Sequence, residues 1–183
     1  AKGKLSAGME AREPALNTRR YIKIRNGKHP LLKSESTVPL NIEFGGDTKG
    51  VIITGPNTGG KTVALKTIGL LSVMACCGLH IPCEDADLAM NADVFCDIGD
   101  GQSIAENLST FSSHIKNIIR ILEKADEESL ILLDELGSGT DPAEGMGIAV
   151  AVLEELRRKG CLFVVTTHYP EVKEYGERAE GVI

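Results

Sequence analysis

Residues Gly55 to Thr62 carry the most chemically informative pattern in this chain. They read GPNTGGKT, which fits the spacing G-x-x-x-x-G-K-[ST] of a phosphate-binding loop, and they follow the apolar run Val51–Ile53. Glycines let the backbone fold around a polyphosphate with successive N–H groups pointing inward, and the helix that follows adds the positive end of its dipole. The pattern therefore predicts a site for a nucleoside triphosphate.

Two side chains of this loop have specific expected roles. Lys61 would reach the β- and γ-phosphates, and Thr62 would hold Mg²⁺ through its hydroxyl, because a hard cation that bridges phosphates takes oxygen ligands. We therefore expect ATP and Mg²⁺ as cofactors. The alternative, a glycine turn without a ligand, is disfavoured by the strand pattern before the loop and the helical pattern after it. The residues expected to contact the nucleotide here are Gly55, Pro56, Asn57, Thr58, Gly59, Gly60, Lys61, Thr62 and Val63.

Two adjacent carboxylates follow a second apolar run. Asp134 and Glu135 close the run Leu130–Leu133, which predicts that both lie at the carboxyl end of a central strand, where open α/β sheets bind ligands. Asp134 would bind Mg²⁺, directly or through a water molecule. Glu135 would orient and deprotonate the water that attacks the γ-phosphorus. The alternative is that the Asp-Glu pair only caps a helix.

The order of the motifs brings two further residues toward the γ-phosphate. His168 follows the apolar run Leu162–Val165 and would contact the γ-phosphate or the attacking water; alone, such a histidine is more often a capping or solvated residue. Ser109 lies in a serine-rich segment at the start of a predicted helix, which is ordinarily an N-cap and is also an anion site. In the ATP-binding-cassette arrangement this element faces the nucleotide of the opposite subunit, so catalysis would require a dimer.

The elements around these motifs predict an α/β fold, a P-loop NTPase of the ATP-binding-cassette type. Its central sheet is expected to be mostly parallel with flanking helices, because aromatic residues make up only 4% of the chain and aliphatic residues must build the core. Alternating residues at 21–24 and 38–44 predict a small antiparallel β layer. Strands are expected at 51–54, 94–98, 130–133 and 161–166, and helices at 61–77, from 109 onward, at 142–159 and at 170–178.

The domain organisation is expected to be simple. Residues 1–20 read as the end of a preceding helix and a connector, and residues 21–183 as one ATPase domain. The last three residues, 181–183, read as a strand that is just beginning. The domain is therefore expected to be incomplete at its C-terminus.

Composition narrows the class of partner and compartment. The formal charge is −6, from 20 Lys and Arg against 26 Asp and Glu, so the segment has no overall electrostatic footprint for nucleic acid. The five cysteines are odd in number and irregularly spaced, and there is neither a signal sequence nor a long apolar run, so we expect a cytoplasmic protein without membrane contact. A zinc site at Cys76, Cys77, His80 and Cys83 is disfavoured, because Cys76 and Cys77 end an apolar helix and are expected to be small core residues.

Four separated motifs in this order resemble the ATPase domain of the MutS family. They are GPNTGGKT at 55–62, STFSSH at 109–114, LLDELGSGTDP at 132–142 and TTHY at 166–169. Thr58, the Ser-Ser-His after Phe111 and the Asp-Pro after Thr140 are similar to the MutS-two branch, which suppresses recombination and carries an Smr nuclease domain, rather than to the mismatch-repair branch. The resemblance covers about residues 21–183.

This resemblance implies a homodimer with two composite ATP sites. Their turnover would be coupled to branched or mismatched DNA, or to the rescue of stalled ribosomes, and the clamp helices and the nuclease would lie outside this chain. The resemblance also implies that Ser109 acts in trans, that Asn57 lies near the γ-phosphate, that 137–141 links the two sites and that His29 lies near the adenine.

Three functions remain open at this point. The first is an ATPase that drives conformational change in a dimer that handles nucleic acid. The second is a nucleotide-gated clamp whose output is binding, with slow turnover only resetting it. The third is a small-molecule kinase, although the chain offers no obvious lid for a phosphate acceptor between its motifs.

Overall fold

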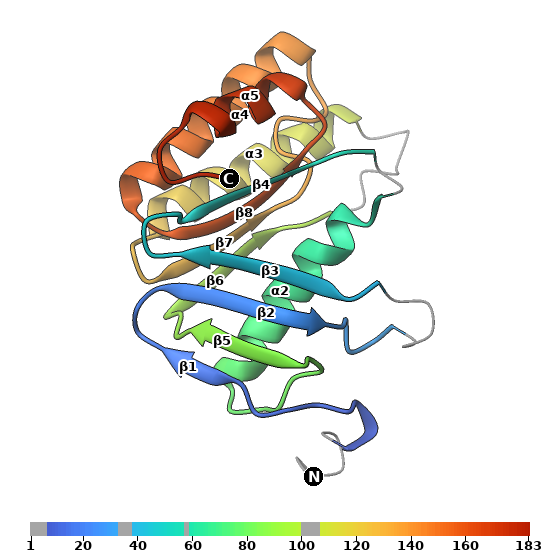
Figure 1. Cartoon of the computed structure of the whole chain (residues 1–183). Coiled ribbons are helices and arrows are strands. Elements are labelled where there is room, and N and C mark those ends of the chain that lie inside the picture. The colour runs from blue at the N-terminus through green and yellow to red at the C-terminus, as the bar shows by residue number, and fades with distance from the viewer. Residues whose placement is uncertain (1–6, 33–37, 57–58, 100–106) are drawn as a thin grey trace.

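A parallel four-stranded sheet forms the centre of the chain in the computed structural model, which describes residues 7–32, 38–56, 59–99 and 107–183, with the backbone alone at 107–110 (Figure 1). All three strand pairs in this sheet are parallel, and the order is β4-β8-β7-β6. The predicted parallel sheet is therefore confirmed. Its strands are β4 (Gly50–Thr54), β6 (Asp93–Asp97), β7 (Ser129–Leu133) and β8 (Leu162–Thr167).

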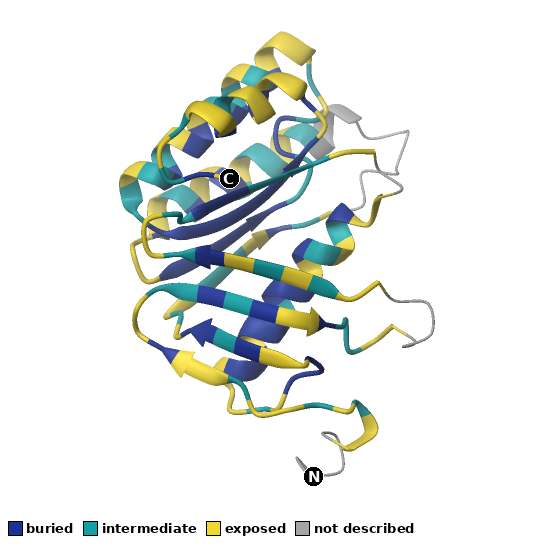
Figure 2. Cartoon of the chain, viewed as in Figure 1, coloured by how far each residue is buried: buried dark blue, intermediate teal, exposed yellow. Residues whose placement is uncertain are grey.

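The two middle strands of this sheet are buried on both faces. In β7, Leu130 and Leu132 pack into one core cluster, whereas Ile131 and Leu133 pack into the other. Every residue of β7 and β8 is buried, as the dark blue strands in Figure 2 show. An apolar run without alternation is what a covered parallel strand requires, because both of its faces must meet apolar partners.

Helices cover both faces of the parallel sheet. One face is packed by α3 (Asn107–Lys124), α4 (Pro142–Lys159) and α5 (Pro170–Arg178), and the other by α2 (Lys61–Cys76). The ends of α4 follow the sequence signals: Asp141 accepts a hydrogen bond from the Ala143 N–H, and Gly160 ends the helix at a φ of 70°. The four predicted helices are thus confirmed.

A second four-stranded sheet packs against α2 and completes its core. β2 (Tyr21–Gly27) is antiparallel to β3 (Leu40–Gly45) on one side and to β5 (Asp85–Ala89) on the other, which confirms the predicted antiparallel layer. The strand β1 (Ala15–Asn17) pairs in parallel with β5, so part of the segment expected to be a connector is instead an edge strand. β5 was also not predicted.

The last residues run alongside β4. The Ile183 N–H donates to the Gly50 carbonyl at 3.0 Å, and the Ile52 N–H donates to the Ile183 carbonyl at 2.7 Å. Val182 forms an isolated parallel bridge with Gly50. The prediction that 181–183 begin a strand is confirmed to this extent.

Candidate active site

Parallel register brings the predicted site residues to one edge of the sheet. Thr54 pairs with Thr167, so the phosphate loop after β4 and His168 after β8 leave the sheet side by side. Leu133 pairs with Val165, which places Asp134 and Glu135 at the same edge. A third strand, β6, ends there with Asp97 opposite Leu133.

Two glycines of the GPNTGGKT motif have positive φ angles. Gly55 and Gly60 have φ values of 135° and 76°, a region that residues with a side chain rarely adopt. A Cβ atom added at Gly55, Gly59 or Gly60 would meet nothing within 4 Å, so no described atom crowds these three glycines. At the start of α2 no described side chain caps the helix, and its first turn holds no acidic residue. These features fit a bound polyphosphate.

Lys61 lies inside this loop. The residue is only 6% exposed, and its ammonium donates a hydrogen bond to the carbonyl oxygen of Gly55. The side chain therefore turns back across the loop that precedes it, where it would meet the phosphates. Its contact with the phosphates stays a prediction.

Asp134 joins the phosphate loop to the neighbouring strands. One carboxylate oxygen accepts a 2.8 Å hydrogen bond from the Thr62 hydroxyl, and the other accepts a 2.5 Å bond from the hydroxyl of buried Thr166. The two predicted metal ligands, Thr62 and Asp134, are therefore in direct contact. Hydroxyl and carboxylate oxygens are the ligand types that Mg²⁺ takes, with the remaining positions left to phosphate and water.

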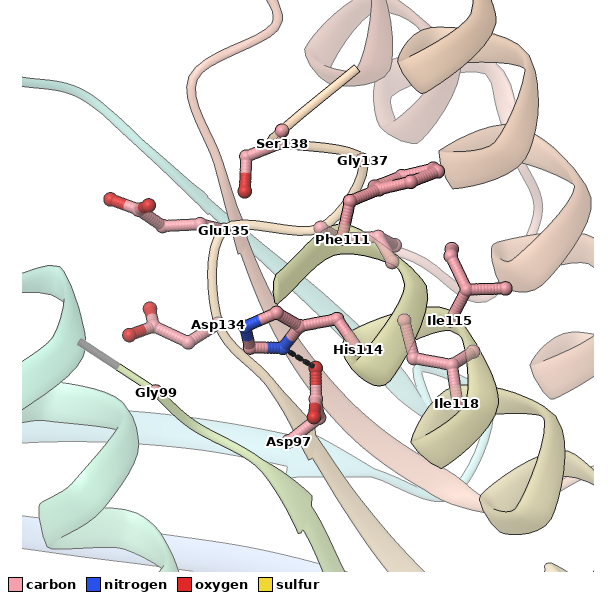
Figure 3. A pocket seen from close by; sticks show the side chains of 12 residues that line it. Asp97, Gly99, Phe111, His114, Ile115, Ile118, Asp134, Glu135, Gly137 and Ser138 are labelled. Carbon is pink, nitrogen blue, oxygen red and sulfur yellow. Dashed lines mark hydrogen bonds and ion pairs between the residues drawn. The ribbon is translucent and has the colours of Figure 1, made fainter. Parts of the chain in front are cut away.

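Glu135 adopts an unusual backbone conformation next to Asp134. Its φ is +49°, and its N–H donates a 2.8 Å hydrogen bond to the Thr166 hydroxyl. Figure 3 shows its carboxylate and that of Asp134 extending to the same side. A non-glycine residue in this region costs on the order of 1 kcal/mol or more and persists where the surroundings hold it, often at functional sites.

A pocket of about 180 Å³ lies beside these two carboxylates. Its wall includes the loop after Glu135 and the α3 residues Phe111 and His114, and Figure 3 shows both helical side chains facing this loop. His114 Nδ1 lies 2.8 Å from a carboxylate oxygen of Asp97. The pocket is therefore lined by apolar side chains, carboxylates and an imidazole, and it lies at the carboxyl edge of the parallel sheet.

Tyr169 is hydrogen-bonded to the loop that follows Glu135. Its buried hydroxyl donates a 3.1 Å hydrogen bond to the Gly137 carbonyl, and burial raises the pKa of this phenol. Gly137 and Gly139 have φ values of 86° and 92°, so the loop bends where only glycine is readily tolerated. His168, in contrast, is exposed, and its ring lies 4.4 Å from that of Tyr169.

Comparison with known proteins identifies the family. Residues 51–183 match the family model described as MutS domain V, which spans most of the chain. The chain belongs to the MutS family. This agrees with the resemblance inferred from its four motifs.

The relatives of this MutS chain point to one branch of the family. It is 55% identical to a protein named Endonuclease MutS2 from Alkaliphilus oremlandii, 54% to one from Geobacillus kaustophilus and 52% to one from Halalkalibacterium halodurans. Each match covers all of this chain and 23%, 24% and 23% of the respective relative. The chain thus spans about a quarter of the length of these relatives.

Some predicted residues of the MutS chain lie away from the pocket or outside the described residues. His29 lines a different pocket, with Met9 and Pro82, and its pKa is lowered by burial and by the positive charge of Lys66 on α2. Its contact with adenine stays a prediction. Asn57 and Thr58 lie outside the described residues, as does the side chain of Ser109, so their roles also stay predictions.

The cysteines correct one prediction. Cys76 and Cys77 are exposed, because the last turn of α2 directs them away from the core, and only Cys83 and Cys161 are buried.

Within the described ranges, no group of three or more His, Cys, Asp or Glu side chains is placed to hold a metal ion. Among the helices that the structure describes, none combines the length and apolar character needed to cross a bilayer.

Sequence reasoning missed two parts of the site. Thr166 holds both Asp134 and the Glu135 backbone; it is the first residue of the TTHY motif, but the motif by itself predicts no role for it. Asp97 and His114 form a partly buried contact; His114 is the last residue of the STFSSH motif, but no motif includes Asp97. The available signal for Asp97 was its position at the end of a predicted strand, the same position that Asp134 has in its own strand.

Proposed function

We propose that this chain binds Mg-ATP at the carboxyl edge of its parallel sheet and hydrolyses the γ-phosphate. The observation that carries the proposal is the 2.8 Å contact between the Thr62 hydroxyl and Asp134, which joins the phosphate loop to the acidic strand. The uncrowded glycines of the loop and the hydrogen bond from Lys61 to the Gly55 carbonyl support the same interpretation. Membership of the MutS family is consistent with it.

The residues of the chain would divide the work of phosphoryl transfer. The loop N–H groups and Lys61 would hold the β- and γ-phosphates, while Thr62 and Asp134 would hold Mg²⁺, which neutralises charge on the phosphate oxygens when bound. Glu135 would accept the proton of the attacking water, since its carboxylate extends beside that of Asp134. His168 would contact the γ-phosphate from the end of β8.

The proposed active form is a homodimer with composite sites. Ser109, in the first turn of α3, would contact the γ-phosphate bound by the twin subunit, and 137–141 would link the two sites. One local contact supports this pairing of elements: a Cβ at Gly139 would lie 3.4 Å from the Cβ of Phe111, so the loop and the start of α3 are adjacent. Both elements also line the same pocket.

The output of ATP turnover is proposed to be exerted on nucleic acid or ribosomes. The candidates are branched or mismatched DNA, with suppression of recombination, and stalled ribosomes. The chain itself carries a net charge of −6, so such contacts are assigned to other segments of the full-length protein, as is any nuclease activity. Turnover of the full-length protein should therefore rise when the true substrate, branched DNA or ribosomes, is added.

Glu135→Gln in the full-length protein tests the proposal. The variant keeps the loop and both metal ligands, so we expect ATP affinity within about threefold of wild type and turnover reduced by roughly a hundredfold or more, the usual contribution of a general base. Glu127→Gln, at an exposed position in the turn before β7, is the matched control and should keep full turnover. Unchanged turnover in Glu135→Gln would contradict the assignment.

The same variant separates the ATPase from the nucleotide-gated clamp. If turnover drives the output, Glu135→Gln should bind ATP but fail to remodel its DNA or ribosome substrate. If ATP binding alone is the output, the variant should retain that activity in full. Release of ADP that depends on an added small-molecule acceptor would instead favour a kinase.

A further inference from the structure

Asp97 is a buried carboxylate that the proposed reaction does not use. Its side chain is 9% exposed at the end of β6, and it accepts two hydrogen bonds from α3. His114 Nδ1 lies 2.8 Å from one carboxylate oxygen, and Asn117 Nδ2 donates to the other at 2.8 Å. Burying a carboxylate is costly unless its oxygens are hydrogen-bonded, so these two contacts are required by the position of Asp97.

The backbone of the same residue contacts the proposed metal ligand. The Asp97 carbonyl accepts a 2.9 Å hydrogen bond from the Asp134 N–H. Asp97 thus lies between α3 on one side and the acidic end of β7 on the other. Asp97 therefore anchors α3 to the strand end that carries Asp134.

The imidazole of His114 is held in a defined orientation. A carboxylate oxygen only accepts hydrogen bonds, so Nδ1 is the donor toward Asp97. A Cβ atom at Gly99 would lie 3.0 Å from His114 Cε1, which shows how closely the chain after β6 packs against the ring. In Figure 3 the second ring nitrogen lies on the side facing Asp134.

Directional contacts are needed here because the rest of the helix is held by apolar packing. Ile118 and Ile121 bury the inner face of α3 in the core cluster under β7. Apolar burial is non-directional and tolerates small rotations of a helix, whereas a hydrogen bond weakens steeply with misalignment. The contacts of Asp97 with His114 and Asn117 therefore fix the rotation of α3 about its axis and its position along that axis.

We propose that His114, oriented by Asp97, is a positioning residue that sets the first turns of α3 relative to Asp134. The inference rests on the proposed function, in which the start of α3 acts on the nucleotide of the twin subunit. His114 would then serve the opposing site rather than its own. The alternative, that it serves the nucleotide bound by its own subunit, predicts a different result in mixed dimers.

Two substitutions at His114 give the first test in the full-length protein. His114→Leu removes the donor to Asp97, whereas His114→Asn retains an amide N–H at a similar distance from the backbone. We expect His114→Leu to bind a nonhydrolysable ATP analogue within about threefold of wild type and to lower turnover at saturating ATP roughly tenfold. His114→Asn should recover most of that loss. Equal turnover of His114→Leu and wild type, or no recovery in His114→Asn, would overturn the inference.

Mixed dimers identify the subunit on which His114 acts. A dimer of one His114→Leu and one Lys61→Ala subunit, isolated with two affinity tags, has one working phosphate loop, and the α3 facing it retains His114. We expect it to match the control dimer of wild type with Lys61→Ala. A rate that stays at half that of the His114→Leu homodimer would overturn the inference. Wild-type protein that hydrolyses no ATP would instead remove the proposed function, and the inference with it.

Discussion

The Thr62 hydroxyl donates a 2.8 Å hydrogen bond to Asp134, a residue 72 positions further along the chain. Thr62 is the second residue of α2, whereas Asp134 directly follows the last residue of β7. The strand β8 lies between β4 and β7, and its residue Thr166 holds the second oxygen of Asp134 at 2.5 Å. Three elements thus hold the Thr62 hydroxyl and the Asp134 carboxylate, the two proposed metal ligands, next to one another.

This contact predicts a hydroxyl requirement at position 62. Thr62→Ala should lower Mg²⁺-dependent turnover roughly a hundredfold, because loss of a metal ligand costs about 3 kcal/mol of charge stabilisation. Thr62→Ser keeps the hydroxyl and should stay within about fivefold of wild type. Turnover measured across a Mg²⁺ titration checks both, and equal rates for the alanine and serine variants would contradict the assignment of Thr62 as a ligand.

A second prediction concerns the close approach of α4 to the loop after Glu135. A Cβ atom at Gly145 would lie 2.2 Å from the Gly137 carbonyl oxygen and 2.8 Å from the Tyr169 hydroxyl. Gly145→Ala should therefore lower the free energy of unfolding by about 1–3 kcal/mol, as overpacking does, and also reduce turnover by displacing the loop. Urea denaturation and steady-state rates measure the two effects.

Gly147 supplies the matched control for this variant. It lies in the same helix but is exposed, and a Cβ there would meet nothing within 4 Å. Gly147→Ala should raise the free energy of unfolding by up to about 1 kcal/mol, because alanine is the better helix former. Equal effects of the two alanine substitutions would argue against the close contact with Gly137.

A third prediction concerns the hydrogen bond between the Tyr169 hydroxyl and the loop that follows Glu135. Tyr169→Phe leaves the buried Gly137 carbonyl without its 3.1 Å donor, and we expect a loss of about 1–2 kcal/mol in the free energy of unfolding. Amide hydrogen exchange should be faster at 137–141 than in wild type and unchanged in β2. Unaltered exchange in the loop would show that the hydroxyl does not hold it.

Thiol reactivity provides a test of burial that is independent of the nucleotide. Burial raises the pKa of Cys161 to about 11 and also raises that of Cys83, so at pH 8 both thiols hold less thiolate than an exposed cysteine. Alkylation of the native full-length protein, followed by peptide mapping, should label Cys76, Cys77 and Cys96 first. Labelling of Cys161 at the rate of Cys96 would contradict the packing around β8.

The elements that sequence reasoning predicted share strong boundary signals. α4 begins at Pro142 and ends before Gly160, and the apolar run Leu130–Leu133 leaves little choice but a covered strand. The phosphate loop fixed the start of α2 at Lys61. Local chemistry was sufficient at these positions, because a proline, a glycine or a continuous apolar run restricts the backbone by itself.

The missed elements depend on partners far along the chain. β5 reads DADLA, and its buried Ala86 and Leu88 alternate with acidic residues over only five positions. β1 has three residues and exists through its pairing with β5. Segments of three to five residues carry too little periodicity to be distinguished from loops, so their structure depends on the strands with which they pair.

The contact of Asp97 with His114 could not be predicted for a similar reason. The sequence places Asp97 at a strand end and His114 near the start of a helix. Which face of α3 meets the sheet is decided by the packing of Ile118 and Ile121, and that choice brings His114 over Asp97. The positions of Asp134 and Glu135 were easier to predict, because the two residues and the apolar run before them are contiguous in the sequence.

Binding of a nonhydrolysable ATP analogue with Mg²⁺ is the most direct measurement of the central claim. Calorimetry on the full-length protein should give a measurable affinity for wild type and, for Lys61→Ala, a loss of at least about 2–3 kcal/mol, as expected when a charged hydrogen-bonding partner is removed from a buried anion site. Lys66→Ala, one turn further along α2 and exposed, should bind as wild type does. Equal affinity for wild type and Lys61→Ala would contradict the account.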